Sequence, residues 1–368
     1  ADNGGLLPRG ACSGGYSFIM TGCPATNMLV STYMKDLMKK TKPSHAYEAI
    51  KRNHAPGGMM SYESADDLKF YVKKGYCPGN AGKTLEWAFQ DWGLSRMALR
   101  MGKKSDAALY EKRSRAWTPL FNKNIGLILP KKENGEWLHT DPLNGQGWVE
   151  ANAWQATWSV SHDLPKLVEL MGGGDAFCEK LNYAFEQARP TDFVHAYSGG
   201  YVSYANQPGC SNAHLFTYGG QPWLTQYWVR QVKEHAYGGI TPDKGYGGHD
   251  EDEGQMGAVS ALMSLGLFSV TGTEYDSPYY DITSPIFDKI TIKLNKDYYS
   301  GDEFVINVHN NSADNCYIQK AELNGTDWIY AQLDHVDFAK GGTLNLWLGN
   351  MPNKSWGKLK YLGFKTNK

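Results

Sequence analysis

The sequence predicts a mainly α-helical protein that ends in a small antiparallel β unit. Segments with apolar residues at helical spacing, joined by glycine- and proline-rich loops, fill the first three quarters of the 368 residues, and short alternating segments follow them. Three polar, glycine-rich loops separate predicted helices, at 145–155, 203–210 and 245–255. Such loops are expected at the open end of a barrel of helical hairpins, where a rigid scaffold holds functional residues.

The helical segments begin and end at ordinary signals. Proline begins the segments at residues 24 and 43, and the segment from 83 to 102 has Glu86 near its start and Gly102 at its end. The pattern predicts about eight or nine helices of ordinary length. They cover residues 24–38, 43–55, 83–102, 104–121, 151–172, 174–187, 222–237 and 255–268. The alternative to an incomplete barrel is that extra helices lie within 61–75 and complete a smaller closed array.

The pattern changes after Ser284. Apolar and polar residues alternate and turn residues intervene, which is typical of short antiparallel strands. The predicted strands lie within 287–294, 303–311, 316–325 and 343–349. We therefore expect a helical catalytic domain over residues 1–283 and a β unit, packed on it, over 284–368.

Composition excludes several classes of function. The formal net charge is -1, so the chain has no excess of Lys and Arg with which to bind nucleic acid. No apolar run is long enough for a predicted membrane span. The six cysteines form no CxxC pair, which leaves a zinc site without support. The 12 Trp and 23 Tyr suit a surface that stacks on sugar rings, although aromatic residues also fill ordinary cores.

Four consecutive acids, Asp250, Glu251, Asp252 and Glu253, stand between glycines and Gln255. Acids at the start of the apolar helix that follows would be favoured by the helix dipole. The alternative is a carboxylate site that activates water or holds a cation.

A series of motifs decides between these interpretations. In chain order they are LPRG, TLEWAFQDW, EANAWQATW followed by SHD, YANQP, GGQPWLTQYWVRQV, DEDEGQM and SPIFDKITI. The series resembles glycoside hydrolase family 92, the calcium-dependent exo-acting α-mannosidases, from Leu7 to Gly357. The resemblance implies an inverting mechanism on α-linked mannose, with an N-terminal β-sandwich followed by an (α/α)6-type barrel.

An inverting glycosidase needs a carboxylic acid to protonate the leaving oxygen and a carboxylate across the sugar to activate water. By the resemblance the acid is Glu150. Partial desolvation by Trp148 and Trp154, which are expected to contact substrate, would favour its protonated form. The resemblance makes Asp252 the base, with Asp250 helping to position water. A Glu that merely begins a helix is the plain alternative for Glu150.

Calcium is the cation that the resemblance implies, and Asp250, Asn206 and Gln207 offer hard oxygen ligands. The ion would hold two adjacent sugar hydroxyls and ease ring distortion. The sequence departs from the family pattern at Gln207, where the family commonly has Glu, and at Cys23, where it commonly has Asp. Cys23 is therefore expected at the sugar-contacting end of the pocket.

His162, which Asp163 follows, has two interpretations. Either the pair supports the substrate pocket from behind, or it is a structural His-Asp pair in the core.

The predicted helices are too few for a complete (α/α)6 barrel, and the missing ones are expected to come first. We therefore expect the chain to be the C-terminal portion of a longer protein, associated with an upstream β-sandwich portion that could be a separate chain. No signal peptide is visible in the chain. A periplasmic or extracellular location is expected from the substrate class alone.

Two alternatives stay open. One is a helical-barrel hydrolase that acts on another glycan. The other is a carbohydrate-binding protein with a decayed site, which Cys23 and Gln207 suggest and the presence of Glu150, Asp250 and Asp252 argues against.

Overall fold

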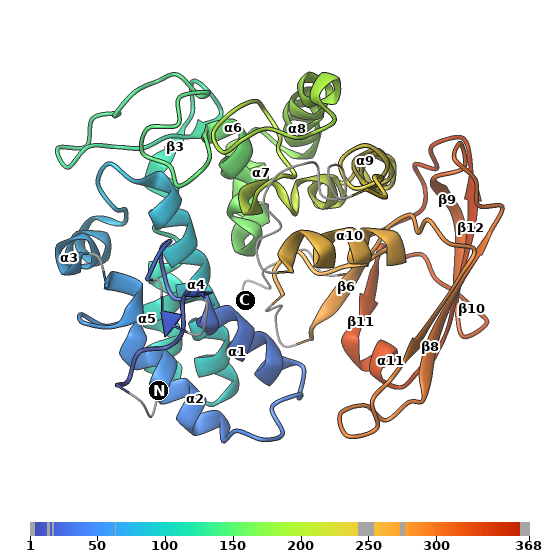
Figure 1. Ribbon diagram of the computed structural model, residues 1–368, viewed down its shortest axis with the longest axis horizontal. Coiled ribbons are helices and arrows are strands. Elements are labelled where there is room, and N and C mark those ends of the chain that lie inside the picture. The colour runs from blue at the N-terminus through green and yellow to red at the C-terminus, as the bar shows by residue number, and fades with distance from the viewer. Residues whose placement is uncertain are drawn as a thin grey trace. The chain divides into compact units, whose positions relative to one another are not determined.

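The computed structural model describes residues 4–12, 15–16, 18–62, 64–241, 254–272 and 277–360. The chain divides into two compact units, and Figure 1 labels their helices and strands. The first unit comprises Ala1–Asp163 and Thr271–Pro278, and the second comprises Leu164–Val270 and Tyr279–Lys368. In the part of the chain that the structure describes, no helix is both long enough and apolar enough to cross a membrane.

The first unit is built around one long helix, α4 (Ala81–Arg100). The side chain of Asn80 caps its start by accepting the N–H of Lys83 at 2.8 Å. Large side chains on several sides of α4 are buried, Trp87 and Trp92 among them, as expected for a helix surrounded by others. Its neighbours are α1 (Ala25–Met34), α2 (Pro43–Asn53) and α5 (Lys104–Arg113). The remaining elements are η1 (Met59–Ser61), α3 (Ala65–Lys74), η2 (Thr118–Leu120), α6 (Ala153–Ala156), η3 (Thr157–Ser159), η4 (Ser161–Asp163) and the two-residue strands β1 (Ala11–Cys12), β2 (Gly15–Tyr16), β3 (Phe121–Asn122) and β4 (Leu127–Ile128).

Two predicted helices were too long. The segment 104–121 is helical only as far as Arg113, and Pro119 lies in the short turn η2 that follows. The segment 151–172 is divided into α6, two 3-10 turns and α7 (Leu164–Leu170). Pro165 is the second residue of α7, where its missing N–H has no helical partner to lose.

The further helix considered within 61–75 is confirmed as α3. Ser64 caps its first turn, because its Oγ accepts the N–H of Asp67 at 3.1 Å. Gly75 ends it at a φ of 84°, the left-handed conformation that glycine adopts without strain.

The helices of the second unit surround an aromatic core. Phe185 on α8 (Gly174–Ala188) lies 5.0 Å from Trp228 on α9 (Pro222–His235), measured between ring centroids, and 5.7 Å from Phe216. The other helical elements here are η5 (Arg189–Thr191), η6 (Gln207–Gly209), η7 (Asn212–Thr217) and α10 (Gln255–Leu265). These contacts anchor the loops between α8 and α9.

The strands of the second unit form two sheets. The larger has the order β10-β9-β12-β8-β7, and alternate residues such as Phe304, Ile306 and Val308 point into the core. Its strands are β7 (Lys289–Lys293), β8 (Glu303–His309), β9 (Tyr317–Leu323), β10 (Thr326–Asp327) and β12 (Gly342–Gly349). The smaller sheet joins β5 (Leu267–Phe268), β6 (Tyr279–Ile282) and β11 (Gln332–Asp334), and α11 (His335–Ala339) follows it. Helix α9 is tied to β9, since the Ile318 N–H donates to Gln226 Oε1 at 2.8 Å.

The expectation of an antiparallel β unit is confirmed for most strand pairs and is wrong for one. Strand β12 pairs with β8 in parallel, from Gly342 opposite Phe304 to Trp347 opposite His309. The chain reaches β12 only after β9, β10, β11 and α11, and this long crossover allows β12 to run parallel to β8. Strands β5 and β6 also precede residue 283, so the β structure begins before the expected boundary.

Candidate active site

Glu150 lies on a loop of the first unit that leads into α6. Its side chain is half-buried, and its backbone has a φ of 50°, which is uncommon for a residue other than glycine. The loop is fastened to α4, because the Ala81 N–H donates to the Gly147 carbonyl at 2.7 Å. His139 Nε2 donates to the Gln146 carbonyl at 2.8 Å. The surroundings therefore hold Glu150 in a strained conformation of the kind that clusters at functional sites.

Trp148 and Trp154 flank Glu150 along this segment. Trp148 is buried and Trp154 is half-buried. The Trp154 carbonyl accepts the indole N–H of Trp158 at 2.7 Å. Asn152 caps α6 by accepting the N–H of Gln155 at 3.1 Å. The segment thus carries Glu150, the predicted acid, and both predicted substrate-contacting aromatics on one stretch that hydrogen bonds hold in place.

Cys23 lies at the end of a clamped loop. Its N–H donates to Gln90 Oε1 at 2.7 Å, and Arg9 Nη1 donates to the neighbouring Gly22 carbonyl at 3.2 Å. Thr21 donates to the carboxylate of Glu86, whose other oxygen accepts from Gln90 at 2.9 Å. Burial raises the pKa of the Cys23 thiol to about 11, so the thiol is neutral at physiological pH. The Cys23 side chain is fully buried in this structure, which gives it no solvent-accessible surface with which to contact a sugar.

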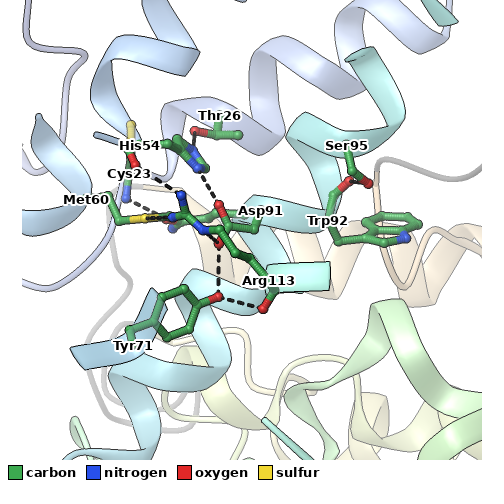
Figure 2. A network of polar contacts seen from close by, with 10 residues as sticks. Cys23, Thr26, His54, Met60, Tyr71, Asp91, Trp92, Ser95 and Arg113 are labelled. Carbon is green, nitrogen blue, oxygen red and sulfur yellow. Dashed lines mark hydrogen bonds and ion pairs between the residues drawn. The ribbon is translucent and has the colours of Figure 1, made fainter. Parts of the chain in front are cut away.

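A buried polar network connects five helices beside Cys23. Figure 2 shows its members meeting around the Asp91 carboxylate. One oxygen of Asp91 accepts from His54 Nδ1 at 2.8 Å, and the other accepts from Tyr71 at 2.9 Å and from Arg113 Nε at 2.8 Å. Because Asp91 fixes the proton of His54 on Nδ1, the Nε2 atom accepts the hydroxyl proton of Thr26 at 2.8 Å.

The order Thr26, His54 and Asp91 resembles a nucleophilic triad, but the three residues are almost completely buried. Burial lowers the pKa of His54 despite the nearby carboxylate. The network therefore positions helices rather than reacting with substrate. Sequence reasoning did not identify it, although Asp91 within the motif TLEWAFQDW, at a core-facing helical position, was a usable signal.

His162 lies in the core. Its Nε2 donates to the Ser114 carbonyl at 2.9 Å, and its ring packs against those of Phe89 and Trp92, with centroids 5.8 and 6.1 Å away. Burial lowers the pKa of His162 to about 4. Asp163 accepts the indole N–H of Trp117 at 3.2 Å. These contacts favour the structural interpretation of the pair.

Asn206 and Gln207 lie in the second unit, at the start of η6. Asn206 is buried, and its Oδ1 accepts the N–H of Gln207 at 2.9 Å. Gln207 is half-buried.

The acidic loop is the part of the candidate site that the structure leaves out. Asp250 and Asp252 fall within 242–253, outside the described residues. Among the residues that are described, no group of three or more His, Cys, Asp or Glu side chains is arranged to hold a metal ion. The oxygens of Asn206 and Gln207 are nevertheless of the hard type that calcium prefers.

Comparisons with known proteins agree over nearly the whole chain. The sequence matches the family model of the glycosyl hydrolase family 92 catalytic domain over residues 1–350. A family 92 inverting mannosidase from Bacteroides thetaiotaomicron is 31% identical, with a TM-score of 0.81 over 94% of this chain and 48% of that one. A second α-mannosidase of that bacterium, 24% identical, shares the fold with a TM-score of 0.83 over 99% of this chain and 48% of its own.

A curated relative, described as an uncharacterized secreted glycosidase of Arthroderma benhamiae, is 27% identical over 394 residues. That match covers 96% of this chain and 48% of the relative, so the chain spans about half the length of the proteins it matches. The family match, the shared fold and the motif around the strained Glu150 have one explanation. This chain belongs to glycosyl hydrolase family 92.

Proposed function

We propose that this chain carries the catalytic residues of an inverting exo-α-mannosidase, which hydrolyses terminal α-linked mannose from glycans. The observation that carries the proposal is Glu150, a carboxyl group held at a φ of 50° on a fastened loop of a family 92 domain. A family 92 relative at 31% identity is described as an inverting mannosidase, which supports the substrate class.

In the proposed mechanism Glu150 donates its proton to the glycosidic oxygen as the bond from that oxygen to the anomeric carbon breaks. Asp252, helped by Asp250, accepts a proton from the water that attacks the opposite face of the anomeric carbon. The leaving alcohol keeps the Glu150 proton, and the product sugar has the inverted configuration. Trp148 and Trp154 would exclude bulk water from the acid.

Calcium would be held by the side-chain oxygens of Asn206 and Gln207 together with the carboxylate of Asp250. When bound, it would supply positive charge to two adjacent hydroxyls of mannose. With Gln207 in place of a carboxylate, the negative charge of this ligand set comes from Asp250 alone.

The wider organisation is also part of the proposal. We propose that the helices belong to an (α/α)6-type barrel and that an upstream β-sandwich portion, in the same or a separate chain, completes the sugar pocket. The relatives' greater length supports this arrangement. The secreted relative supports a periplasmic or extracellular location.

The test compares Glu150→Gln with the wild-type protein on an unactivated α-mannobiose and on an aryl mannoside with a good leaving group. General acid catalysis contributes about 100- to 10,000-fold. We expect a loss of that size on mannobiose and a smaller loss on the aryl mannoside, which needs little protonation. Glu133→Gln, an exposed acid on the preceding segment, is the matched control and should keep full activity.

Each assay is repeated with a chelator and again after calcium is restored. Activity that a chelator leaves intact would contradict the role of calcium. Equal losses on both substrates would contradict the role of Glu150. Turnover of α-glucosides alone would favour a hydrolase of another glycan, and binding without turnover of any glycoside would favour a carbohydrate-binding protein.

A further inference from the structure

A long segment of the second unit lacks all four of the charged residue types Asp, Glu, Lys and Arg. From Phe193 through Val229 the sequence has no Asp, Glu, Lys or Arg, although such residues make up 20% of the chain. Its loop 195–203, in which Ala196 and Tyr197 are exposed, contains two Tyr and two Ser residues. A loop with hydroxyl groups and no charged side chain of its own matches a neutral polar ligand and offers little to a phosphate or a nucleic acid.

Hydrogen bonds join the two ends of loop 195–203 within this segment. The hydroxyl of Ser203 accepts the His195 N–H at 3.1 Å and donates to the His195 carbonyl at 2.8 Å. Just outside, the Tyr204 N–H donates to the Phe193 carbonyl at 2.7 Å. These bonds preorganise the loop, which lowers the entropic cost of binding a ligand.

The backbone of this loop also stores strain. Tyr197 has a φ of 43° while its side chain remains 44% exposed. Gly200 has a φ of 71°, and a Cβ there would lie 2.1 Å from the ring of His195. Strain of this kind at an exposed aromatic residue is typical of binding sites.

A second aromatic residue reaches the loop from α8, which is labelled in Figure 1. Tyr183 on α8 is 47% exposed, and its ring meets that of Tyr201 edge to face, with centroids 5.8 Å apart at 84°. Burial and the neighbouring Tyr183 phenol raise the pKa of Tyr201, so the Tyr201 phenol stays neutral. Two rings at right angles form a corner with an apolar face and hydroxyl groups at the edge.

We propose that this tyrosine corner, defined as Tyr183, Tyr197 and Tyr201, binds a neutral hexose ring of an oligosaccharide substrate. A sugar offers C–H groups to an aromatic face and hydroxyls to the phenols. Loop 195–203 leads within three residues to Asn206, one of the proposed calcium ligands. The proposal rests on the proposed function, and it extends recognition beyond the terminal mannose to a further sugar of the glycan.

The test measures binding of an α-linked mannotriose and of free mannose by calorimetry, in the Glu150→Gln background to prevent turnover. We expect Tyr183→Ala and Tyr197→Gly each to weaken mannotriose binding about 5- to 10-fold, with mannose binding unchanged. Tyr197→Gly suits a positive φ, so it removes the ring without straining the fold. Tyr183→Phe keeps the ring and loses only the hydroxyl, so it should weaken mannotriose binding less than Tyr183→Ala does.

Tyr62→Ala is the matched control, since Tyr62 is 50% exposed in the first unit and should not affect either sugar. Unchanged mannotriose affinity in both tyrosine variants would overturn the proposal, as would a parent protein that does not bind mannotriose. The two proposals are separable. Suppose that these variants bind mannotriose more weakly but that the protein with Glu150 intact hydrolyses no mannoside. The tyrosine corner would then be supported and the mannosidase function refuted.

Discussion

At the scale of single residues, the charges of Asp91 and Arg113 are paired in the core of the first unit. Asp91 is fully buried and accepts hydrogen bonds from His54, Tyr71 and Arg113. The guanidinium of Arg113 is itself only 11% exposed. Removing one charge from such a pair leaves the other buried without compensation, which costs more than the intact pair contributes.

We therefore expect Asp91→Asn to lower the free energy of unfolding by about 3 to 5 kcal/mol, measured by urea denaturation at pH 7. Asp66→Asn is the control, because Asp66 forms an exposed ion pair with Lys69 whose loss should barely change stability. A change in Asp91→Asn as small as the control's would mean that the buried network does not hold the five helices together.

His162 predicts a specific dependence of stability on pH. Its pKa in the folded state is about 4, below the ordinary value of 6.5, because burial disfavours the charged ring. Below pH 6.5 the unfolded chain therefore binds a proton that the folded chain does not. The contribution of neutral His162 to the free energy of unfolding is therefore complete above pH 6.5, and it is lost as the pH falls towards 4.

His162→Gln can keep the hydrogen bond to the Ser114 carbonyl but does not titrate. When the pH is lowered from 7 to 4.5, the free energy of unfolding should decrease in both proteins. The decrease should be about 2 to 3 kcal/mol smaller in the variant than in the wild-type protein. His54 and the other buried histidines are common to both proteins, so their effects cancel in this difference. Parallel pH profiles for the two proteins would contradict a buried, neutral His162.

At the scale of elements, the loop that holds Glu150 depends on one glycine. Gly147 has a φ of 82°, and a Cβ there would lie 2.7 Å from Pro130 and 2.9 Å from the Gly79 carbonyl. Gly135 has a similar φ of 89° but nothing within 4 Å of the same position. Alanine at position 135 would therefore introduce backbone strain alone, whereas alanine at position 147 would introduce the same strain and a steric clash.

We expect Gly147→Ala to displace the Glu150 loop and to lower kcat/KM for an aryl mannoside by about 100-fold, the size of effect that misplacing a reacting group produces. Gly135→Ala should cost about 1 to 2 kcal/mol of stability for its φ and leave activity per folded molecule unchanged. Full activity in Gly147→Ala would show that the loop tolerates a shift and that Glu150 needs no fixed position.

At the scale of the whole molecule, the proposed upstream portion makes a prediction about the chain on its own. Apolar surface that normally contacts another portion favours association when exposed. Residues 1–368 expressed alone are therefore expected to associate and to hydrolyse mannosides poorly. Light scattering, thermal melting and mannobiose turnover measure these properties. A monomer that melts cooperatively and has full activity would contradict a required upstream portion.

Local patterns in the sequence were sufficient for most of the elements. Helices α2, α4, α8 and α9 and strands β7, β8 and β9 lie where the apolar period and the turn residues predict them. These signals are local, because a period of 3.6 or 2 depends only on neighbouring side chains. The motif series likewise indicated family 92 before any contact was known.

Only the tertiary structure decided which residues each side chain meets. The sequence could not reveal that Cys23 and His162 are buried, because burial depends on helices that pack from distant parts of the chain. The parallel pairing of β12 with β8 has the same origin, since alternation along a strand carries no information about its neighbour's direction. The strain at Glu150 also depends on α4, whose first turn holds the neighbouring loop, and so no local pattern could have predicted it.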